Sequence, residues 1–339
     1  MKLGRASYRF ANVYLETSAT VVGEMEADGP LGKYFDLKES DPYFGKKSWE
    51  QAEVYMNELA VGKVLEKAGM KETELDLAFG GDLINQLVAT HYAMRKFDIP
   101  FIGVYSACAT AIESLILAST FLDHALAKRA LTVASSHTNM AEKQFRMPVE
   151  YGGPKGSTAQ YTATGSGAAI LSTTQADIKI ESATVGVIVD AMQNDPTDMG
   201  SAMAPAAAHT ISRHLRELGL NANYYDLILT GDLSNVGSPI LTDLLKKEGH
   251  EIENQHDDCG KMLYHAHQPT FAGASGAGCV SIVTFGYVVE MLKTKQLNKV
   301  LIVGTGALLN ATIVSQNETI PCIAHAVALV SQAVGGDAS

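Results

Sequence analysis

Residues 52–86, "AEVYMNELAVGKVLEKAGMKETELDLAFGGDLINQ", decide the fold because the chain repeats their pattern. Residues 204–237 read "APAAAHTISRHLRELGLNANYYDLILTGDLSNVG". Each copy predicts an amphipathic helix that ends near a glycine and continues through a short polar turn into an apolar strand. Both strands end in Gly-Asp-Leu, at 81–83 and at 231–233. A repeat of this length predicts two halves built on one supersecondary plan.

Two further pairs of segments follow in the same order. "FIGVYSACATAIESL" at 101–115 matches "TFAGASGAGCVSIVTFGYVVEML" at 270–292, and each is a turn of small residues that opens a buried helix. "AKRALTVASSHTNM" at 127–140 matches "LNKVLIVGTGALLN" at 297–310, and each is a buried strand with a small-residue end. Alternating helices and strands predict an α/β fold with mostly parallel, covered sheets.

The boundary between the halves is predicted near 174–177. We therefore expect an N-terminal half at residues 1–175 and a C-terminal half at residues 176–339. The chain has 339 residues and is 46% hydrophobic, which is ample for a large core.

The charge balance and the cysteines narrow the function classes. The formal net charge of −11 argues against nucleic acid as a partner, and there is no long basic stretch to hold acidic lipid. The four cysteines form no CxxC pair, so neither a zinc site nor a redox dithiol is predicted. No signal peptide or membrane-spanning run is found. We expect a soluble, cytoplasmic protein with reduced thiols, and attachment to a membrane through a partner stays open.

The stretch "GVYSACATAIESLILAS" at 103–119 places Cys108 at a strand-to-helix elbow. An enzyme would place a thiolate nucleophile there, because a helix N-terminus and a neighbouring histidine lower the pKa of a thiol. The same position also suits a small residue that lines a pocket. Both interpretations of Cys108 stay open at this point.

Two α/β halves with a cysteine at the first elbow resemble the thiolase superfamily, which includes the ketoacyl-acyl-carrier-protein synthases. "TGSGAAILS" at 164–172 looks like the glycine-rich hairpin of those synthases. Within the superfamily, the chain resembles the stage V sporulation protein AD family of spore-forming bacteria. "DGPLGKYFD" at 28–36, "KSWEQAE" at 47–53, "HDDCG" at 256–260 and "ETIPCIAHAV" at 318–327 carry that resemblance.

This resemblance implies a non-enzymatic role. Proteins of this family belong to the sporulation machinery that moves dipicolinic acid (pyridine-2,6-dicarboxylate, with calcium) into the developing spore. It implies dipicolinic acid as ligand, other stage V membrane proteins as partners, and a peripheral position at the forespore or spore inner membrane. Superfamily members usually pair as homodimers. No cofactor is expected, although calcium accompanying dipicolinate stays open.

The catalytic partners of the superfamily are replaced at three positions. The thiolase motif GHPxGxSG corresponds to "PTFAGASG" at 269–276, where Thr270 stands in place of the histidine. Ile302 stands where thiolases have a second cysteine, and Gly231 or Asp232 stands where the synthases have their other histidine. Cys108 is therefore interpreted as a vestigial nucleophile position. Two alternatives remain: an acyltransferase that pairs Cys108 with His137 or His325, and a scaffold that docks membrane partners and keeps only a vestigial pocket.

Ligands of such folds bind beyond the carboxyl ends of the parallel strands. The predicted ligand-binding residues are Cys108, Ser136, His137, Arg146, Asp232, Thr270, Ser275 and Thr305. Arg146 is the candidate fork donor for a carboxylate, or else a partner of Glu142 or Glu150 in a surface ion pair. Asp82 and Asp232 also suit strand-end caps. No metal site is predicted, because Asp257 and Asp258 lack EF-hand spacing and are interpreted as a loop cap or a solvated turn.

Overall fold

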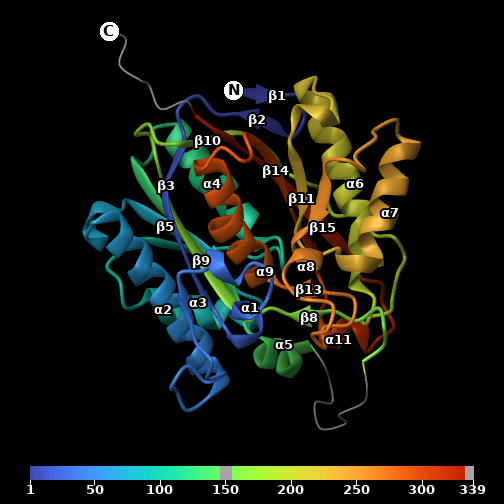
Figure 1. The fold of residues 1–339 in the computed structure, drawn as a ribbon, viewed down its shortest axis with the longest axis horizontal. Helices are drawn as coiled ribbons and strands as arrows, with labels where there is room; N and C mark the ends of the chain where they lie inside the picture. The colour runs from blue at the N-terminus through green and yellow to red at the C-terminus, as the bar shows by residue number, and fades with distance from the viewer. Residues whose placement is uncertain (146–154, 333–339) are drawn as a thin grey trace.

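The structure, a computed structural model, describes residues 1–145 and 155–332 (Figure 1). Each half of the chain contributes five strands to the main sheet, in one and the same spatial order. In the first half these are β3 (Tyr14–Val22), β9 (Gly165–Ser172), β7 (Arg129–Ser136), β5 (Leu77–Gly81) and β6 (Phe101–Gly103). In the second half they are β10 (Ile178–Thr184), β15 (Cys322–Ser331), β14 (Lys299–Ala307), β11 (Leu227–Thr230) and β12 (His256–Asp258).

The strand directions repeat as well. In the first half β7, β5 and β6 pair in parallel, whereas β9 pairs antiparallel with both β3 and β7. The second half has the same pattern, with β15 antiparallel to both β10 and β14. Of these five strands in each half, four thus run the same way. This confirms the predicted duplicated α/β fold with mostly parallel strands.

Short strands complete the sheets. β10 and β3 are antiparallel and share only two residue pairs, which join the two halves. β2 (Ser7–Arg9) pairs with β10 and with β1 (Lys2–Leu3), and β4 (Leu37–Lys38) pairs with β3. β8 (Tyr161–Thr162) and β13 (Ala274–Ser275) form a separate parallel pair that connects the halves near the carboxyl ends of the main strands.

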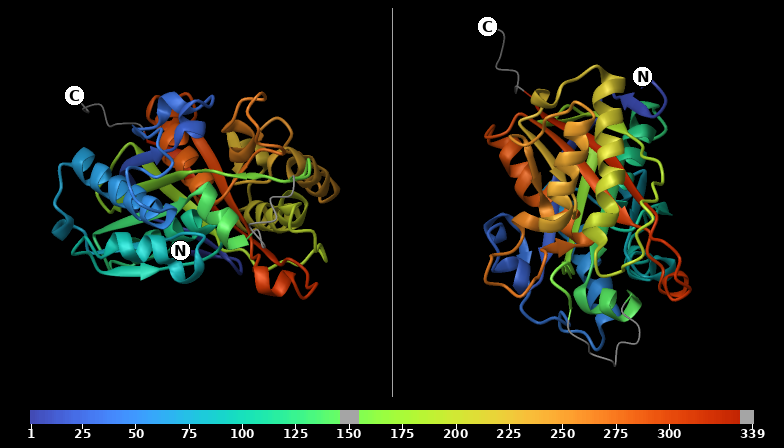
Figure 2. Two further views of the ribbon diagram at one scale, coloured as in Figure 1. Left: turned by 90° about the horizontal axis from the view of Figure 1, so that it is seen from below. Right: turned by 90° about the vertical axis from the view of Figure 1, so that its right-hand side faces the viewer.

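Helices form three layers around the sheets (Figures 1 and 2). The first half is covered on its outside by α2 (Trp49–Ala68) and α3 (Val88–Met94), and the second half by α6 (Met199–Leu218) and α7 (Ser234–Lys247). Between the halves lie α4 (Thr110–Asp123) and α9 (Ala277–Ile282), and α9 continues through a π-helix at Val283–Val288 into α10 (Val289–Lys293). The short helices are α1 (Glu24–Ala27), α5 (Thr138–Phe145), α8 (Cys259–Met262) and α11 (Ala311–Val314).

The two long outer helices begin and end by the same local rules. Ser48 caps α2 by accepting a hydrogen bond from the Gln51 N–H, and Asp198 caps α6 in the same way through the Ser201 N–H. Both helices end at a glycine with a left-handed backbone, a conformation that glycine adopts without steric cost. Because both helices share these kinds of capping residue, the repeat can be recognised in the sequence.

The apolar core has one part in each gap between layers. The central part surrounds α4 and α9 and includes Ile112, Leu115, Val280 and Phe285. Separate clusters lie under α2 and under α6. Because the central part contains residues of both halves, the two halves pack against each other through it.

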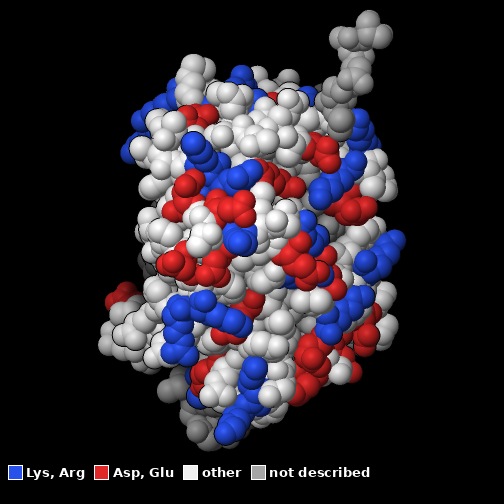
Figure 3. Space-filling view, turned by 90° about the vertical axis from the view of Figure 1, so that its left-hand side faces the viewer, with Lys and Arg blue, Asp and Glu red and all other residues white. Residues whose placement is uncertain are grey.

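On the left-hand face in the view of Figure 1, acidic and basic side chains are interspersed (Figure 3). Ion pairs of the described chain include Lys67 with Asp36 at 2.8 Å and Lys96 with Glu58 at 2.9 Å. Within residues 1–145 and 155–332, no helix combines the length and apolar character needed to cross a bilayer.

Candidate ligand-binding site

Cys108 lies in a tight elbow between β6 and α4. Ala107 has a positive φ of 49°, which is uncommon for a residue with a side chain. Thr110 holds the turn: its hydroxyl donates to the Ala107 carbonyl oxygen at 2.7 Å and accepts from the Ser106 N–H at 3.0 Å. The elbow predicted from the small residues is thus present, and it carries local backbone strain.

The second half of the chain approaches this elbow closely through β14. A side chain at Gly306 would overlap the carbonyl oxygen of Ser106, so only glycine permits this approach. Thr305, next to it on the strand, is fully buried. The close approach explains why "GTG" stands at the end of this strand.

Four of the predicted ligand-binding residues converge here from both halves. The Asp232 carboxylate accepts hydrogen bonds from the Thr305 hydroxyl at 2.6 Å, the Ser275 hydroxyl at 2.8 Å and the Gly276 N–H at 3.0 Å. The Cys108 Sγ lies 3.8 Å from the Ser275 Oγ. Cys108 is 6% exposed and Asp232 is completely buried. Asp232 therefore acts as a tie between the turns of the second half, with Cys108 packed against it.

The electrostatics of this group disfavour a thiolate. Burial raises the pKa of the Cys108 thiol well above its usual range, and the neighbouring Asp232 carboxylate raises it further. Burial also raises the pKa of Asp232, although hydrogen bonds from Thr305, Cys108, Gly276 and Ser275 oppose the shift. Burial and the Asp232 carboxylate thus keep Cys108 as a neutral thiol near neutral pH. A nucleophilic cysteine needs the opposite, a lowered pKa.

An apolar cluster surrounds Cys108 on the side of the first half. Its buried members besides Cys108 are Leu83, Ile84, Met140 and Ala277. Trp49, Val88 and Phe145, which are partly buried, pack against it. None of these side chains is among the ligand-binding residues predicted from the sequence. Two features of the sequence could have pointed to them. Leu83 and Ile84 directly follow the repeated Gly-Asp, and Trp49 is the chain's single tryptophan.

For three other predicted residues, Ser136, Thr270 and His137, the hydrogen bonds that the described chain shows lie outside this group. The Ser136 hydroxyl donates to the Ala163 carbonyl at 2.7 Å and accepts from the Gly278 N–H at 3.0 Å. Thr270 is 5% exposed, and its backbone N–H and C=O bond to Gln268 and Gly273 within its loop. Ser136 therefore stabilises the turn that carries Ser275, and Thr270 shapes the preceding loop.

His137, the third of these residues, is also engaged by the backbone. Its Nδ1 accepts from the Asn139 N–H at 3.2 Å, so the Nε2 carries the proton and donates to the Pro42 carbonyl at 2.8 Å. Burial lowers the pKa of His137. The neutral ring thus connects the end of β7 to the segment before α2.

His325, the other histidine considered as a base, faces Ser106 rather than Cys108. Its Nδ1 accepts from the Gly186 N–H at 3.1 Å, and its Nε2 lies 3.3 Å from the Ser106 Oγ. The Ser106 hydroxyl donates to Glu113 at 2.8 Å. Burial lowers the pKa of His325 to about 4. His325 is therefore neutral, with both nitrogens in use.

Arg146 lies outside the described residues. Two lysines of the neighbouring segments are described, and both form ion pairs: Lys143 with Glu50, and Lys155 with Glu142. Lys155 also lies over the rings of Tyr161 and Phe271, at 5.6 and 5.9 Å from their centroids. Positive charge is thus present near α5, but acidic neighbours partly balance it.

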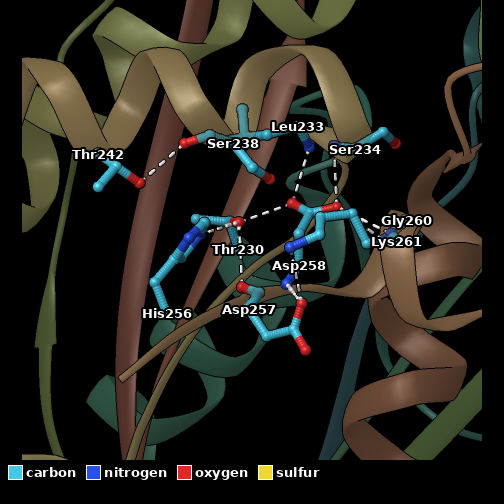
Figure 4. A network of polar contacts seen from close by, with 10 residues as sticks. All are labelled: Thr230, Leu233, Ser234, Ser238, Thr242, His256, Asp257, Asp258, Gly260 and Lys261. Atoms are coloured by element: carbon cyan, nitrogen blue, oxygen red, sulfur yellow. Dashed lines mark hydrogen bonds and ion pairs between the residues drawn. The ribbon is translucent and has the colours of Figure 1, made fainter. Parts of the chain in front are cut away.

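A second buried aspartate organises the turns beside Asp232 (Figure 4). The Asp258 carboxylate accepts from the Thr230 hydroxyl at 2.6 Å and from the backbone N–H groups of Leu233, Ser234 and Gly260 at 2.8–2.9 Å. Burial raises the pKa of Asp258 to about 6. Within the described chain, no group of three or more His, Cys, Asp or Glu residues is arranged to hold a metal ion. Asp258 thus caps the turns after β11 and β12.

Solved structures of low sequence identity share this fold. A 3-oxoacyl-[acyl-carrier-protein] synthase III from Aquifex aeolicus VF5 is 14% identical with a TM-score of 0.57, covering 94% of this chain and 99% of that one. A variant of OleA from Xanthomonas campestris, solved with cerulenin, is 14% identical with a TM-score of 0.62, covering 95% of this chain and 97% of that one. These likenesses define the chain as a protein with the thiolase-like fold.

Sequence comparison narrows the class to one family. The sequence model of stage V sporulation protein AD matches residues 4–330. The stage V sporulation protein AD of Bacillus subtilis (strain 168) is 47% identical over 338 residues, which is 99% of each chain. The chain belongs to the stage V sporulation protein AD family, as its sequence motifs indicated.

Proposed function

We propose that this sporulation protein binds dipicolinate at the Cys108 site and does not convert it. The observation that carries the non-catalytic part is the Asp232 carboxylate beside the Cys108 thiol, because it works against the thiolate that acyl transfer requires. Dipicolinate itself rests on the resemblance to the family. The relatives of like fold named above are enzymes, so turnover is the alternative that needs a direct test.

The described part of the site offers different chemistry to the ring and to the carboxylates of such a ligand. Leu83, Ile84 and Met140 provide apolar surface for a planar ring. The N-terminus of α4, a helix of 14 residues, favours negative charge. Lys143 and Lys155 add positive charge at the side of α5.

Asp232 sets a condition on how a dianion binds. A ligand carboxylate near an ionised Asp232 would be repelled, so a cation or a proton has to offset one charge. Calcium accompanying the ligand would supply the cation, and the raised pKa of Asp232 favours the proton. Titrations with and without calcium separate these two routes.

Isothermal titration calorimetry of the full chain with dipicolinate tests the proposal. We expect saturable binding that is weakened by Arg146→Ala and by Cys108→Phe, which would fill the space against the cluster. Lys246→Ala, on α7, is the control and should bind like the wild type. A folded wild-type protein that gives no heat above the dilution background would overturn the proposal.

The enzyme alternative has its own measurement. An acyltransferase that uses Cys108 would gain mass when incubated with acyl-coenzyme A donors. We expect the intact mass to stay unchanged across a panel of donors. An acyl adduct that maps to Cys108 would establish covalent chemistry instead. Dipicolinate-site variants that keep full sporulation function while surface variants lose it would favour the scaffold alternative.

For the assembly, we propose a homodimer that joins the edge strand β6 to its copy. In the described chain β6 pairs on one side only, with β5. Ile102 and Tyr105, at this edge, are 43% and 44% exposed. An unprotected edge with apolar side chains is a ready site for strand pairing. Peripheral attachment to the spore inner membrane through other stage V proteins is proposed from the family. A monomer by sedimentation velocity would contradict the dimer.

A further inference from the structure

Trp49 is the chain's only tryptophan and lies at the start of α2, directly after the cap residue Ser48. Its ring packs against the apolar cluster that contains Cys108, Ile84 and Met140. On the other side Trp49 stacks on Tyr43, with ring centroids 5.8 Å apart and planes at 19°. Trp49 therefore forms an aromatic wall of the Cys108 site, held in place by a second ring.

The indole nitrogen of this wall lacks a partner. The Trp49 Nε1 is buried and makes no hydrogen bond within residues 1–145 and 155–332. An indole N–H can only donate, and a buried Trp N–H usually finds an acceptor. Leaving a buried donor unpaired costs free energy, so such a group calls for a partner, which an ordered water, an ion or a ligand can supply.

A carboxylate is the acceptor that fits this place best. The ligand class already proposed for the site is a planar aromatic dicarboxylate, which presents a ring and anionic oxygens together. An aromatic wall with a buried N–H donor matches both parts: the Trp49 ring can stack on the ligand ring, and its N–H can form a charge-assisted hydrogen bond. Asp232, on the second-half side of Cys108, already accepts hydrogen bonds from three groups of its own half, Ser275, Gly276 and Thr305.

We infer that Trp49 is a ligand-binding residue of this site, donating its indole N–H to a carboxylate of dipicolinate and covering the pyridine ring. The inference rests on the proposed function. Because the nitrogen is closed to solvent without ligand, entry of the ligand requires partly buried neighbours to move. Val88 and Phe145 are partly buried side chains that pack against the same cluster.

The test compares dipicolinate binding by the wild type, Trp49→Phe and a matched control, Tyr55→Phe, on the same helix. Trp49→Phe keeps an aromatic ring but removes the donor, so we expect its dissociation constant to rise about tenfold or more. We expect its melting temperature without ligand to stay close to that of the wild type, because the loss of an unpaired buried donor offsets the packing that the smaller ring loses. Tyr55→Phe should bind like the wild type.

A second readout needs no variant. Trp49 is the sole source of tryptophan emission, so dipicolinate should change that emission with the same dissociation constant that calorimetry gives. Excitation at the red edge of tryptophan absorption avoids tyrosine and the ligand. Wild-type binding without a change in emission, or with an unchanged dissociation constant for Trp49→Phe, would overturn the inference and leave the proposed function standing. No binding by the wild type would remove both.

Discussion

At the scale of single residues, the pair of Cys108 and Asp232 decides what the site can do. The two residues come from different halves of the chain, and Ser275 contacts both of them. The carboxylate keeps three donors in place and at the same time disfavours ionisation of the thiol. A side chain that holds turns together thus also controls the chemistry of its neighbour.

Replacing Asp232 with Asn should make Cys108 more acidic and speed its alkylation. The negative charge that raises the pKa of the thiol is removed, so more thiolate exists at a given pH. Iodoacetamide labelling between about pH 7 and pH 9, read at the Cys108 peptide by mass spectrometry, measures the rate. We expect an increase of roughly tenfold, which is one pKa unit.

Thr305→Val is the matched control for this experiment. It removes the hydroxyl that donates to Asp232 but keeps the charge. If loosening of the turns alone exposed Cys108, the control would be labelled as fast as Asp232→Asn. We expect it to stay close to the wild type, and equal acceleration in both variants would refute the electrostatic explanation.

At the scale of elements, the loop at residues 82–87, between β5 and α3, has a strained backbone and carries part of the apolar cluster. Gln86 and Leu87 both have positive φ, of 63° and 54°. Asp82 holds one end by accepting from the Thr90 hydroxyl at 2.7 Å, and the His91 Nδ1 lies 3.0 Å from the Gln86 and Leu87 carbonyl oxygens. These bonds fix a conformation that the residues would not adopt alone.

Replacing Gln86 with Gly should stabilise the protein by about 1 kcal/mol. The side chain is exposed and the backbone is left-handed, so glycine relieves strain that outweighs its added chain entropy. Urea unfolding measures the change in the free energy of unfolding. Asn85→Gly, at an exposed neighbour without positive φ, should instead cost about 0.5–1 kcal/mol. The same sign for both variants would show that the strain is not stored at Gln86.

The repeat made the order of elements predictable, whereas contacts between distant residues were not. The Gly-Asp-Leu copies and the helix-ending glycines are local signals, and the order of helices and strands along the chain follows from them. By contrast, the meeting of Asp232 with Cys108 and the bond from His137 to Pro42 depend on tertiary packing that no local pattern encodes. Trp49 stood in a quoted motif, but its unpaired N–H exists only in the folded chain.

At the scale of the whole molecule, buried acids make stability depend on pH. Burial raises the pKa of Glu26, in α1, to about 7 from 4.5. Its Oε1 accepts from the Thr164 N–H at 3.0 Å and from the Tyr264 hydroxyl, whereas its Oε2 has no partner within the described chain. The folded protein therefore binds this proton more tightly than the unfolded chain does.

The free energy of unfolding of the wild type should fall as pH rises, and replacing Glu26 with Gln should remove this fall. Stability falls in the wild type from about pH 4.5 to about pH 7, because only the unfolded chain readily loses the proton. The shift corresponds to about 3 kcal/mol. Between about pH 5 and pH 8, we expect the free energy of unfolding of Glu26→Gln to rise relative to that of the wild type by about this amount, as measured by urea unfolding.

Glu24→Gln, at an exposed position of the same helix, serves as the control and should follow the wild type across the pH range. A gain for Glu26→Gln that does not change with pH would mean that the substitution acts through packing rather than through the proton. The pH profile therefore separates the two causes.

The tie made by Asp232 has a consequence for anyone who would re-engineer this protein into a working enzyme. Restoring a reactive thiol requires that the carboxylate be taken away, yet Ser275, Gly276 and Thr305 all depend on it for a hydrogen bond. A single substitution would thus gain reactivity and lose rigidity at the same place. A redesigned enzyme would first need a new acceptor for these three hydrogen-bond donors. A catalytic base could be added only after the turns are held in place again.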